Sequence, residues 1–146
     1  MGEYNPVRAN GANPFTRTAG AQVTAGQIVM ASANGAVTAG SAAGGAAVVG
    51  VAAHDAVNTD ANSGLLTVWP LDGVEHRVAC PGGAAAGDGI TCGDAGIAVT
   101  APHTGGPPTT FAAAAAAGKL IGICTVGCDA DEEGDTGHVA QFIGRG

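Results

Sequence analysis

The second half of the chain repeats the pattern of the first half, and this repeat limits the possible folds more than any other feature. Three segments recur in the same order. The matched segments are 25–39 with 86–101, 48–52 with 120–124, and 64–69 with 137–142. The offset grows from 61–62 residues to 72–73 across an insertion around 102–117, so the copies differ mainly in one loop. A conserved order of segments predicts two copies of one structural unit.

Each copy has the short apolar alternation and the frequent turn signals of a β structure. Asn34-Gly35 separates two apolar stretches and is a strong β-hairpin signal. Asp72-Gly73 predicts a tight turn before a half-buried strand. The predicted strands of the first copy are 27–30, 36–38, 48–52, 65–69 and 74–78. Each copy is thus predicted as a hairpin, a buried strand with a central glycine, a polar loop and a strand that ends in an aromatic residue.

The composition restricts how these units can build a core. Alanine and glycine account for 58 of the 146 residues, and Val, Ile, Leu and Phe together for only 27. A core of large side chains and a coiled coil are excluded, while the 12% charged residues argue against disorder. Units this poor in large side chains are expected to share one core. We predict an all-β, barrel-like body of two half-repeats, 19–79 and 80–146, with at most one short helix at 112–117 that Gly118 ends.

Residues 1–18 differ from the rest of the chain. Their two prolines and three asparagines disfavour regular structure. Tyr4, Arg8, Phe15 and Arg17 supply aromatic and basic groups that could anchor this segment to a partner. The segment is predicted to be an extended N-terminal arm, and a frayed terminus without a role is the alternative.

Charge and hydropathy exclude two classes of partner. The formal net charge is −7, and the chain has only five basic residues, too few for the basic patch that nucleic-acid binding requires. No apolar run approaches the roughly 20 residues that span a bilayer, and the N-terminus lacks the regions of a signal peptide. We expect a protein that is made in a cytoplasm and binds neither nucleic acid nor membranes.

The four cysteines all fall in the second copy. Structural zinc sites use closely spaced pairs such as C-x2-C, whereas eleven residues separate the first pair here and three the second. Cys92 and Cys124 align with apolar residues of the first copy, so we expect free buried thiols that fill the core. Disulfides formed after release from a reducing cell and a metal site are the alternatives. The cysteines are Cys80, Cys92, Cys124 and Cys128.

The acidic segment 129–135 partly imitates a calcium-binding loop. Such a loop needs a bidentate Glu at its twelfth position, where Ala140 stands, and a helix on either side. We expect a solvated hairpin loop here and no metal site.

Two short segments contain residue types that catalyse hydrolysis, His54-Asp55 and Glu75-His76-Arg77. Neither has a nucleophile or a second acid at a useful spacing. We expect His76 to be a surface residue of its alternating strand. The protein is predicted to have no enzymatic activity and no cofactor, and a hydrolase that uses Glu75 and His76 is the alternative.

With these segments in place, the sequence resembles the capsid decoration proteins of tailed bacteriophages. These proteins, of the lambda type, are also termed cement or head-stabilisation proteins. The resemblance rests on the run Gly26-Gln27-Ile28-Val29, on Val49-Gly50-Val51-Ala52 with the acidic residue that follows, and on the strand 65–69 with its terminal aromatic. It covers most of 19–79 and extends to 80–146 through the repeat.

The resemblance implies a β-tulip or small barrel that binds the outer surface of the mature phage capsid and stabilises the shell. The implied partner is the major capsid protein, and the implied assembly is a homotrimer at threefold or quasi-threefold capsid sites. The N-terminal arm, with Tyr4, Arg8, Phe15 and Arg17, is then expected to bind the capsid by adding a strand to its edges. Another virion surface module, such as a fibre base or a carbohydrate-binding β domain, is the alternative.

Overall fold

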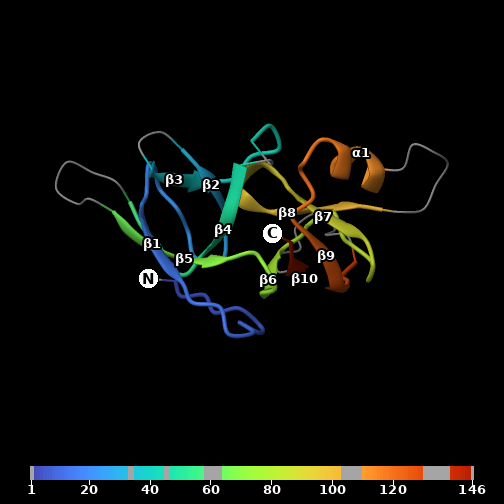
Figure 1. The fold of residues 1–146 in the computed structure, drawn as a ribbon, viewed down its shortest axis with the longest axis horizontal. Coiled ribbons are helices and arrows are strands. Elements are labelled where there is room, and N and C mark those ends of the chain that lie inside the picture. The colour runs from blue at the N-terminus through green and yellow to red at the C-terminus, as the bar shows by residue number, and fades with distance from the viewer. Residues whose placement is uncertain are drawn as a thin grey trace.

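The computed structural model describes residues 2–32, 35–44, 47–57, 64–102, 110–129 and 139–145. Within these residues the chain forms two five-stranded antiparallel sheets (Figure 1). The first sheet contains, in spatial order, β1 (Phe15–Thr18), β5 (Leu65–Pro70), β4 (Val48–Ala52), β2 (Ile28–Ala31) and β3 (Val37–Ala39). The second contains β6 (Glu75–Ala79), β10 (Val139–Gly144), β9 (Gly122–Val126), β7 (Gly89–Cys92) and β8 (Ala98–Ala101). The predicted all-β class is confirmed.

The second sheet repeats the strand order of the first, with each strand five places later in the chain. The change of sheet falls between β5 and β6, whereas the sequence pattern placed the strand 74–78 in the first half-repeat. The reason is that β1 already pairs with β5. The turn at Asp72-Gly73, where Gly73 has a φ of +71°, therefore leads the chain to β10 in the second sheet.

The strand β1 corrects the expectation that residues 1–18 lack regular structure. Phe15–Thr18 pairs antiparallel with β5, with Phe15 opposite Val68 and Thr18 opposite Leu65. The prolines of this segment, Pro6 and Pro14, both precede β1, so every residue of the strand keeps its backbone N–H for pairing.

The register of β5 and β10 differs by one residue from the alignment of the sequence repeat. Val68 and Phe142 occupy the same place, because they pair with corresponding residues of β4 and β9, and both are fully buried. Trp69 therefore corresponds to Ile143 and not to Phe142. A slip of one residue moves a side chain to the other face of a sheet. The prediction that both copies carry an aromatic residue at the same place at the end of this strand is therefore wrong.

Gly50 and Gly122 occupy the same place in the two sheets, and neither position has room for a side chain. A Cβ on Gly50 would collide with the carbonyl oxygen of Trp69. A Cβ on Gly122 would lie 2.5 Å from the carbonyl oxygen of Ile143 and 2.5 Å from the Phe142 ring. The repeated glycine thus reflects close backbone approach between neighbouring strands in both sheets.

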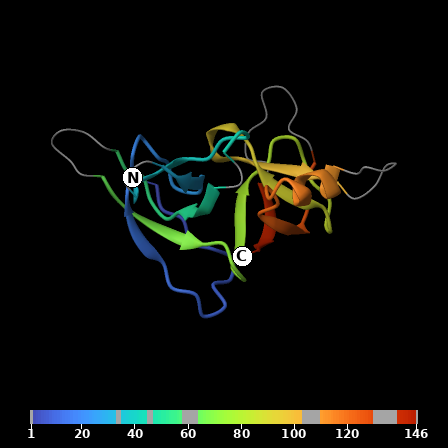
Figure 2. The same cartoon turned by 45° about the horizontal axis from the view of Figure 1, so that its top comes forward.

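The buried residues form two clusters. The two sheets lie next to each other (Figure 2). The larger cluster joins them and contains Ile28 and Val51 from the first sheet together with Val78, Ile90 and Phe142 from the second. The smaller cluster belongs to the first sheet alone. It consists of Ala19, Val23, Val29, Val37, Ala52, Ala56, Leu66 and Val68. The first sheet therefore buries both of its faces, as the alternation of strand side chains allows.

One α-helix, α1 (Thr110–Ala116), occurs in the described residues and lies beside β8 (Figure 1). It confirms the predicted short helix, beginning two residues earlier, and Gly118 follows it with a φ of +70°. A 3-10 helix, η3 (Asp94–Gly96), precedes β8. The strands β2 and β3 pair as predicted, while Asn34 of the connecting turn lies outside the described residues.

Candidate functional site at the N-terminal arm

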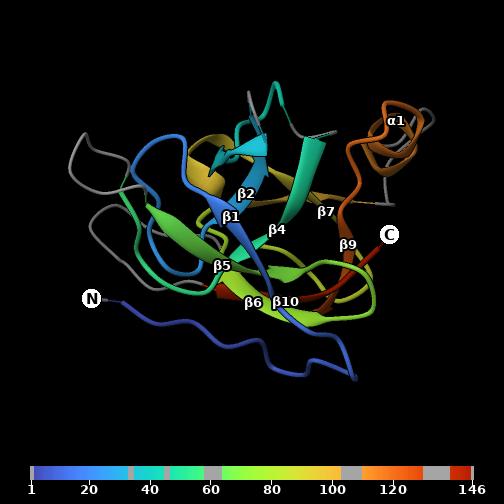
Figure 3. The same cartoon turned by 60° about the vertical axis from the view of Figure 1, so that its left-hand side comes forward.

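Residues 2–14, here termed the docked arm, lie along the body and do not extend away from it. The segment passes below β6 and β10 and then turns back into β1 (Figure 3). The N–H of Tyr4 donates to the carbonyl oxygen of Ala53 at 2.7 Å, and an isolated antiparallel bridge joins Arg8 to Glu75. The docked arm therefore contacts both halves of the chain.

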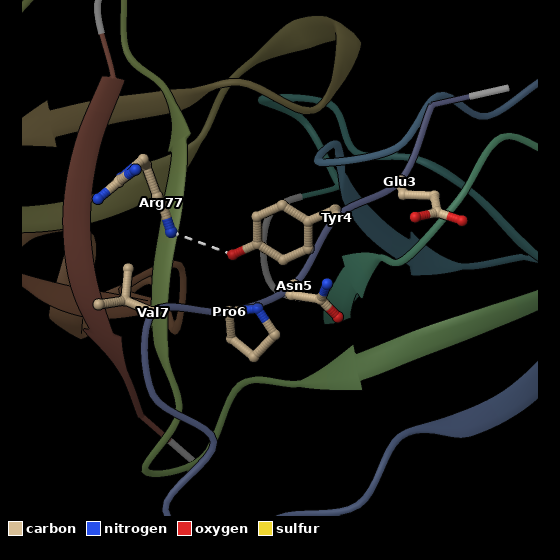
Figure 4. Close-up of a pocket in the computed structure, with 6 residues that line it drawn as sticks. All are labelled: Glu3, Tyr4, Asn5, Pro6, Val7 and Arg77. Carbon is tan, nitrogen blue, oxygen red and sulfur yellow. Dashed lines mark hydrogen bonds between the residues drawn. The ribbon is translucent and has the colours of Figure 1, made fainter.

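Tyr4 is the main anchor of the docked arm. The Tyr4 hydroxyl accepts a hydrogen bond of 3.0 Å from the backbone N–H of Arg77 (Figure 4) and lies 2.9 Å from Nδ1 of His76. The Tyr4 and His76 rings stack with their centroids 5.9 Å apart. On its other side the His76 ring contacts Phe142, at a centroid distance of 5.6 Å. Tyr4 is thereby connected to the shared core.

The hydrogen bonds around His76 fix where its proton lies. Nε2 of His76 lies 2.8 Å from the carbonyl oxygen of Pro70, which can only accept, so Nε2 carries the proton of the neutral ring and donates it. Nδ1 is then an acceptor, and the Tyr4 hydroxyl donates a hydrogen bond to it while accepting from the N–H of Arg77. Burial lowers the pKa of His76, and burial raises the pKa of Tyr4 to about 12. Both groups are neutral at pH 7, so the pair holds the arm without a buried charge.

A second anchor joins Arg8 to the buried residue Glu75. The Arg8 Nε donates to Oε2 of Glu75 at 3.0 Å, and the Thr125 hydroxyl donates to Oε1 at 2.9 Å. The backbone N–H groups of Val7 and Arg8 also donate to the Glu75 carbonyl oxygen. The Glu75 carboxylate is therefore buried with a cationic partner and a hydroxyl donor, as an ionised group inside a protein requires.

The first residues of the docked arm are held by Asp55. The backbone N–H of Gly2 donates to one carboxylate oxygen of Asp55 at 3.0 Å, and the N–H of Ala25 donates to the other at 2.8 Å. These two hydrogen bonds lower the pKa of Asp55. The acidic residue that follows β4 thus fixes the start of the chain.

Phe15 and Arg17 lie in β1 and not in the docked arm. They share one face of the strand, and the Arg17 guanidinium lies 4.7 Å from the centre of the Phe15 ring. Phe15 packs against the smaller core cluster, whereas Arg17 is exposed. Of the four residues expected to anchor an arm to a partner, Tyr4 and Arg8 contact this chain's own body, and Arg17 remains on the surface.

Two shallow grooves flank the docked arm. The first has a volume of about 480 Å³ and is shown in Figure 4. The second has a volume of about 300 Å³ and lies between the docked arm and β5. Residues lining the first are Glu3, Tyr4, Asn5, Pro6, Val7 and Arg77, and the second is lined by Glu3, Tyr4, Asn5, Pro14, Ala53, His54, Thr67 and Trp69. Their open shape suits contact with a protein surface more than enclosure of a small molecule.

The expectation that His76 is a surface residue is wrong, because its exposed fraction is 0%. The signal was present in the sequence: Val74, His76 and Val78 alternate on one face of the strand, and both valines are buried. The contacts of the docked arm with the body were not expected from the sequence. They join residues 49 to 73 positions apart, which no local pattern reveals.

Each of the four cysteines replaces an alanine of the first half at the corresponding place. When the two sheets are aligned by the register of their strands and bridges, Cys80 corresponds to Ala19, Cys92 to Ala31, Cys124 to Ala52, and Cys128 to Ala56. All four are free thiols, and Cys128 is less buried than the others. Burial raises the pKa of Cys80 and of Cys92 to about 11.

The part of the chain that the structure describes holds no group of three His, Cys, Asp or Glu side chains placed to bind a metal ion. Residues 130–138 lie outside it, and with them most of the acidic segment 129–135. Among the described helices, none has the length and apolar character needed to cross a membrane.

Comparisons with known proteins were made for sequence and for structure. No protein-family model matches the sequence, and no curated protein matches it. Among solved structures, the chain is similar to the N base of the head fiber protein gp8.5 of bacteriophage phi29, with a TM-score of 0.54 and 19% sequence identity. The match covers 90% of this chain and 92% of the phage chain. The two proteins therefore share a fold over nearly their whole lengths.

Proposed function

We propose that this protein is a structural component of a tailed-phage virion that binds the outer surface of the head through the major capsid protein and stabilises the shell. The observation that carries the proposal is the fold shared with a phage head-fiber base across 90% of the chain. The resemblance of residues 19–79 to decoration proteins points to the same class of protein. In this proposal the role is structural and needs neither catalysis nor a cofactor.

The physical properties of the body support such a role. A net charge of −7 on a chain rich in alanine and glycine resists nonspecific aggregation away from the shell. The strand β1 lies at an edge of the first sheet and exposes Thr16 and Arg17. An edge strand can accept an added strand from a partner. We propose that the capsid contact includes β1 together with the exposed side of the docked arm, and that the assembly is a homotrimer.

A second candidate function is the base of a head fibre. It is favoured by the same structural likeness, because the phage protein is itself the base of such a fibre. The two candidates share binding to the head and differ in their consequence. A decoration protein occupies many sites and makes the shell more resistant to rupture, whereas the base of a fibre has no need to change the resistance of the shell to rupture.

The test uses phage heads that lack this protein, mixed with the purified full-length chain and sedimented. We expect saturable binding to expanded heads, and a higher rupture temperature when the sites are filled. Saturable binding without a change in rupture temperature would favour the fibre base. Failure of the wild-type chain to sediment with heads would overturn both candidates.

Arg17→Glu tests the proposed contact on β1. We expect it to weaken binding by about tenfold or more, which corresponds to about 1.4 kcal/mol. Arg145→Glu is the matched control, because it makes the same charge change on another exposed arginine, at the end of β10. Equal weakening by both variants would show a general charge effect and would contradict a contact on β1. Light scattering of the free protein tests the trimer.

A further inference from the structure

Three of the four cysteines gather at one end of the second sheet. Cys80 directly follows β6, Cys124 lies in β9, and Cys128 follows β9 by two residues. All three pack in or against the shared core. Their counterparts Ala19, Ala52 and Ala56 pack together in the smaller cluster of the first half. The second half therefore places three thiols where the first half places three methyl groups.

Cys80 and Cys128 are in direct contact. The Cys128 thiol donates to the carbonyl oxygen of Cys80 at 3.5 Å. No other pair of cysteines shows such a contact among the described hydrogen bonds. The Cys128 sulfur is thus beside the backbone of Cys80 before any bond forms between the two residues.

The backbone around both thiols is held in place. Cys128 and Ala84 exchange two backbone hydrogen bonds, of 3.0 and 2.9 Å. The carbonyl oxygen of Cys80 accepts from the N–H of Gly83 at 3.0 Å, and the Cys80 thiol lies 3.6 Å from the Gly83 carbonyl oxygen. Little ordering is therefore required when the sulfur atoms join.

The pairing of Cys124 with Cys128 is excluded by their distance along the strand. Cys124 and Cys128 are four residues apart on an extended segment, which places their Cα atoms about 13 Å apart. Two Cα atoms more than about 7 Å apart cannot be bridged without backbone movement. Cys92 lies in β7, where its thiol contacts the carbonyl oxygen of Gly93 and faces Gly40 of the first half.

We propose that Cys80 and Cys128 form an intramolecular disulfide when the protein meets an oxidising medium. The inference does not depend on the virion role, although a particle released from a cell would meet such a medium. The bond would tie the end of β6 to the end of β9, and would enclose residues 81–127 in one covalent loop. Such a loop restricts the unfolded chain and stabilises the fold.

The oxidant is a small-molecule disulfide, and the reaction proceeds in two exchanges. The Cys128 thiolate, which is the less buried of the two, attacks one sulfur of the oxidant and releases one small thiol. The Cys80 thiolate then attacks the Cys128 sulfur of the mixed disulfide and releases the second small thiol. The two cysteines lose two electrons and two protons, and one small disulfide is reduced to two thiols. Because burial raises the pKa of Cys80 to about 11, the second exchange is expected to speed up between pH 7 and 9.

The experiment treats the full-length chain with oxidised glutathione at pH 8.5 and measures its intact mass under denaturing, non-reducing conditions. We expect a loss of about 2 Da, the mass of two hydrogen atoms, which a reductant reverses. Trypsin cannot assign the bond, because no Lys or Arg separates Cys80 from Cys92 or Cys124 from Cys128. The assignment therefore uses single Cys→Ala variants, which place at each position the residue that the first half already has.

Cys92→Ala and Cys124→Ala are expected to lose about 2 Da as the wild type does. Cys80→Ala and Cys128→Ala are expected not to lose it, and Cys80→Ala should instead keep a glutathione adduct on Cys128. The oxidised wild type should also unfold at a higher temperature than the reduced protein, and Cys80→Ala should show no such rise. A mass loss that persists in Cys80→Ala or in Cys128→Ala would overturn the proposal. So would an unchanged wild-type mass after oxidation.

Discussion

The two sheets have the same strand order but are filled differently, and the difference separates what the backbone requires from what the side chains provide. Gly50 and Gly122 recur because in each sheet a neighbouring strand leaves no space for a Cβ. The residues that differ between the two sheets are those whose side chains pack in the core. Val68 of the first sheet is replaced by the larger Phe142 in the second, and small alanines are replaced by cysteines.

The comparison also explains why the docked arm is anchored to the second sheet. Phe15 of β1 and His76 of β6 occupy the same place, because each pairs with the corresponding residue of its neighbouring strand. A phenyl ring offers no hydrogen-bond partner, whereas the imidazole accepts from Tyr4 and donates to Pro70. One change of side chain in a duplicated frame thus creates the acceptor that receives the chain's own N-terminal segment.

The largest expected loss of stability comes from Phe142, which differs in size from Val68 at the corresponding place in the first sheet. Phe142→Ala should lower the free energy of unfolding by about 3–5 kcal/mol, because the ring fills the core that joins both sheets. Val68→Ala, its matched variant, should cost about 2 kcal/mol. Urea unfolding of both variants measures the difference. Equal losses would mean that the shared core is no more important than the smaller cluster.

Substitution of the glycine that recurs in both sheets should lower the free energy of unfolding equally in each sheet. Gly50→Ala and Gly122→Ala should each destabilise by about 2–3 kcal/mol, because the added methyl group meets backbone of the adjacent strand. Gly82→Ala is the control, since a Cβ there meets nothing within 4 Å. A neutral result at one of the two strand positions would show that the sheets do not share this requirement.

The buried histidine should make stability depend on pH. Because the pKa of His76 is lower in the folded chain than its ordinary value of 6.5, the unfolded chain binds the proton more tightly. The contribution of neutral His76 to the free energy of unfolding is complete above pH 6.5. It is lost as the pH falls through the pKa that His76 has in the folded chain. His76→Phe, which copies Phe15 of the first sheet, should flatten this part of the stability profile. Urea midpoints between pH 5 and 7.5 measure it, and identical profiles would refute the role of His76.

Removal of the Tyr4 hydroxyl should have a smaller effect. Tyr4→Phe deletes the hydrogen bond to His76 and leaves the backbone N–H of Arg77 without this acceptor. We expect a loss of about 1–2 kcal/mol, together with faster amide exchange at Arg77 and Glu75. Protection at β8, which lies at the opposite edge of the second sheet from β6, should stay unchanged, and uniform loss of protection would contradict a local anchor.

Arg8→Ala should have the smallest effect of the series. The Arg8 side chain is 71% exposed, so solvent screens its ion pair with Glu75, and we expect a loss of about 1 kcal/mol or less. Arg17→Ala serves as the control on the first sheet, where the guanidinium has no carboxylate partner among the described contacts. The Arg8 effect should shrink in high salt, and a salt-independent loss would assign it to packing.

The sequence allowed the strands, the short helix and the buried thiols to be predicted, because each leaves a local signal. Short apolar runs mark β4 and β5, and Gly118 marks the end of α1. The strand β1 could not be predicted, because the prolines and asparagines before it mask a four-residue pairing that depends on β5. The register of β10 was missed by one residue, since a repeat rich in small residues aligns almost equally well at neighbouring offsets.

The candidate site was predicted only in part. Tyr4 and Arg8 were recognised as anchoring residues from their chemistry, but their partners His76 and Glu75 lie 72 and 67 residues away in the chain. Contacts at such separations have no periodic signature in the sequence. The alternation of Val74, His76 and Val78 carried the remaining information, and it indicated a buried histidine.

The position of the docked arm has a consequence for the order of folding. This segment is synthesised before the residues that anchor it, because those anchors exist only after residue 77 has been made. Contacts so distant in sequence form slowly, because a long loop must close first. Until the arm closes, the edge of β6 stays open to a segment from another molecule. We therefore expect that crowded, rapid synthesis favours exchange of arms between chains, and that slow refolding at high dilution yields chains that each bind their own arm.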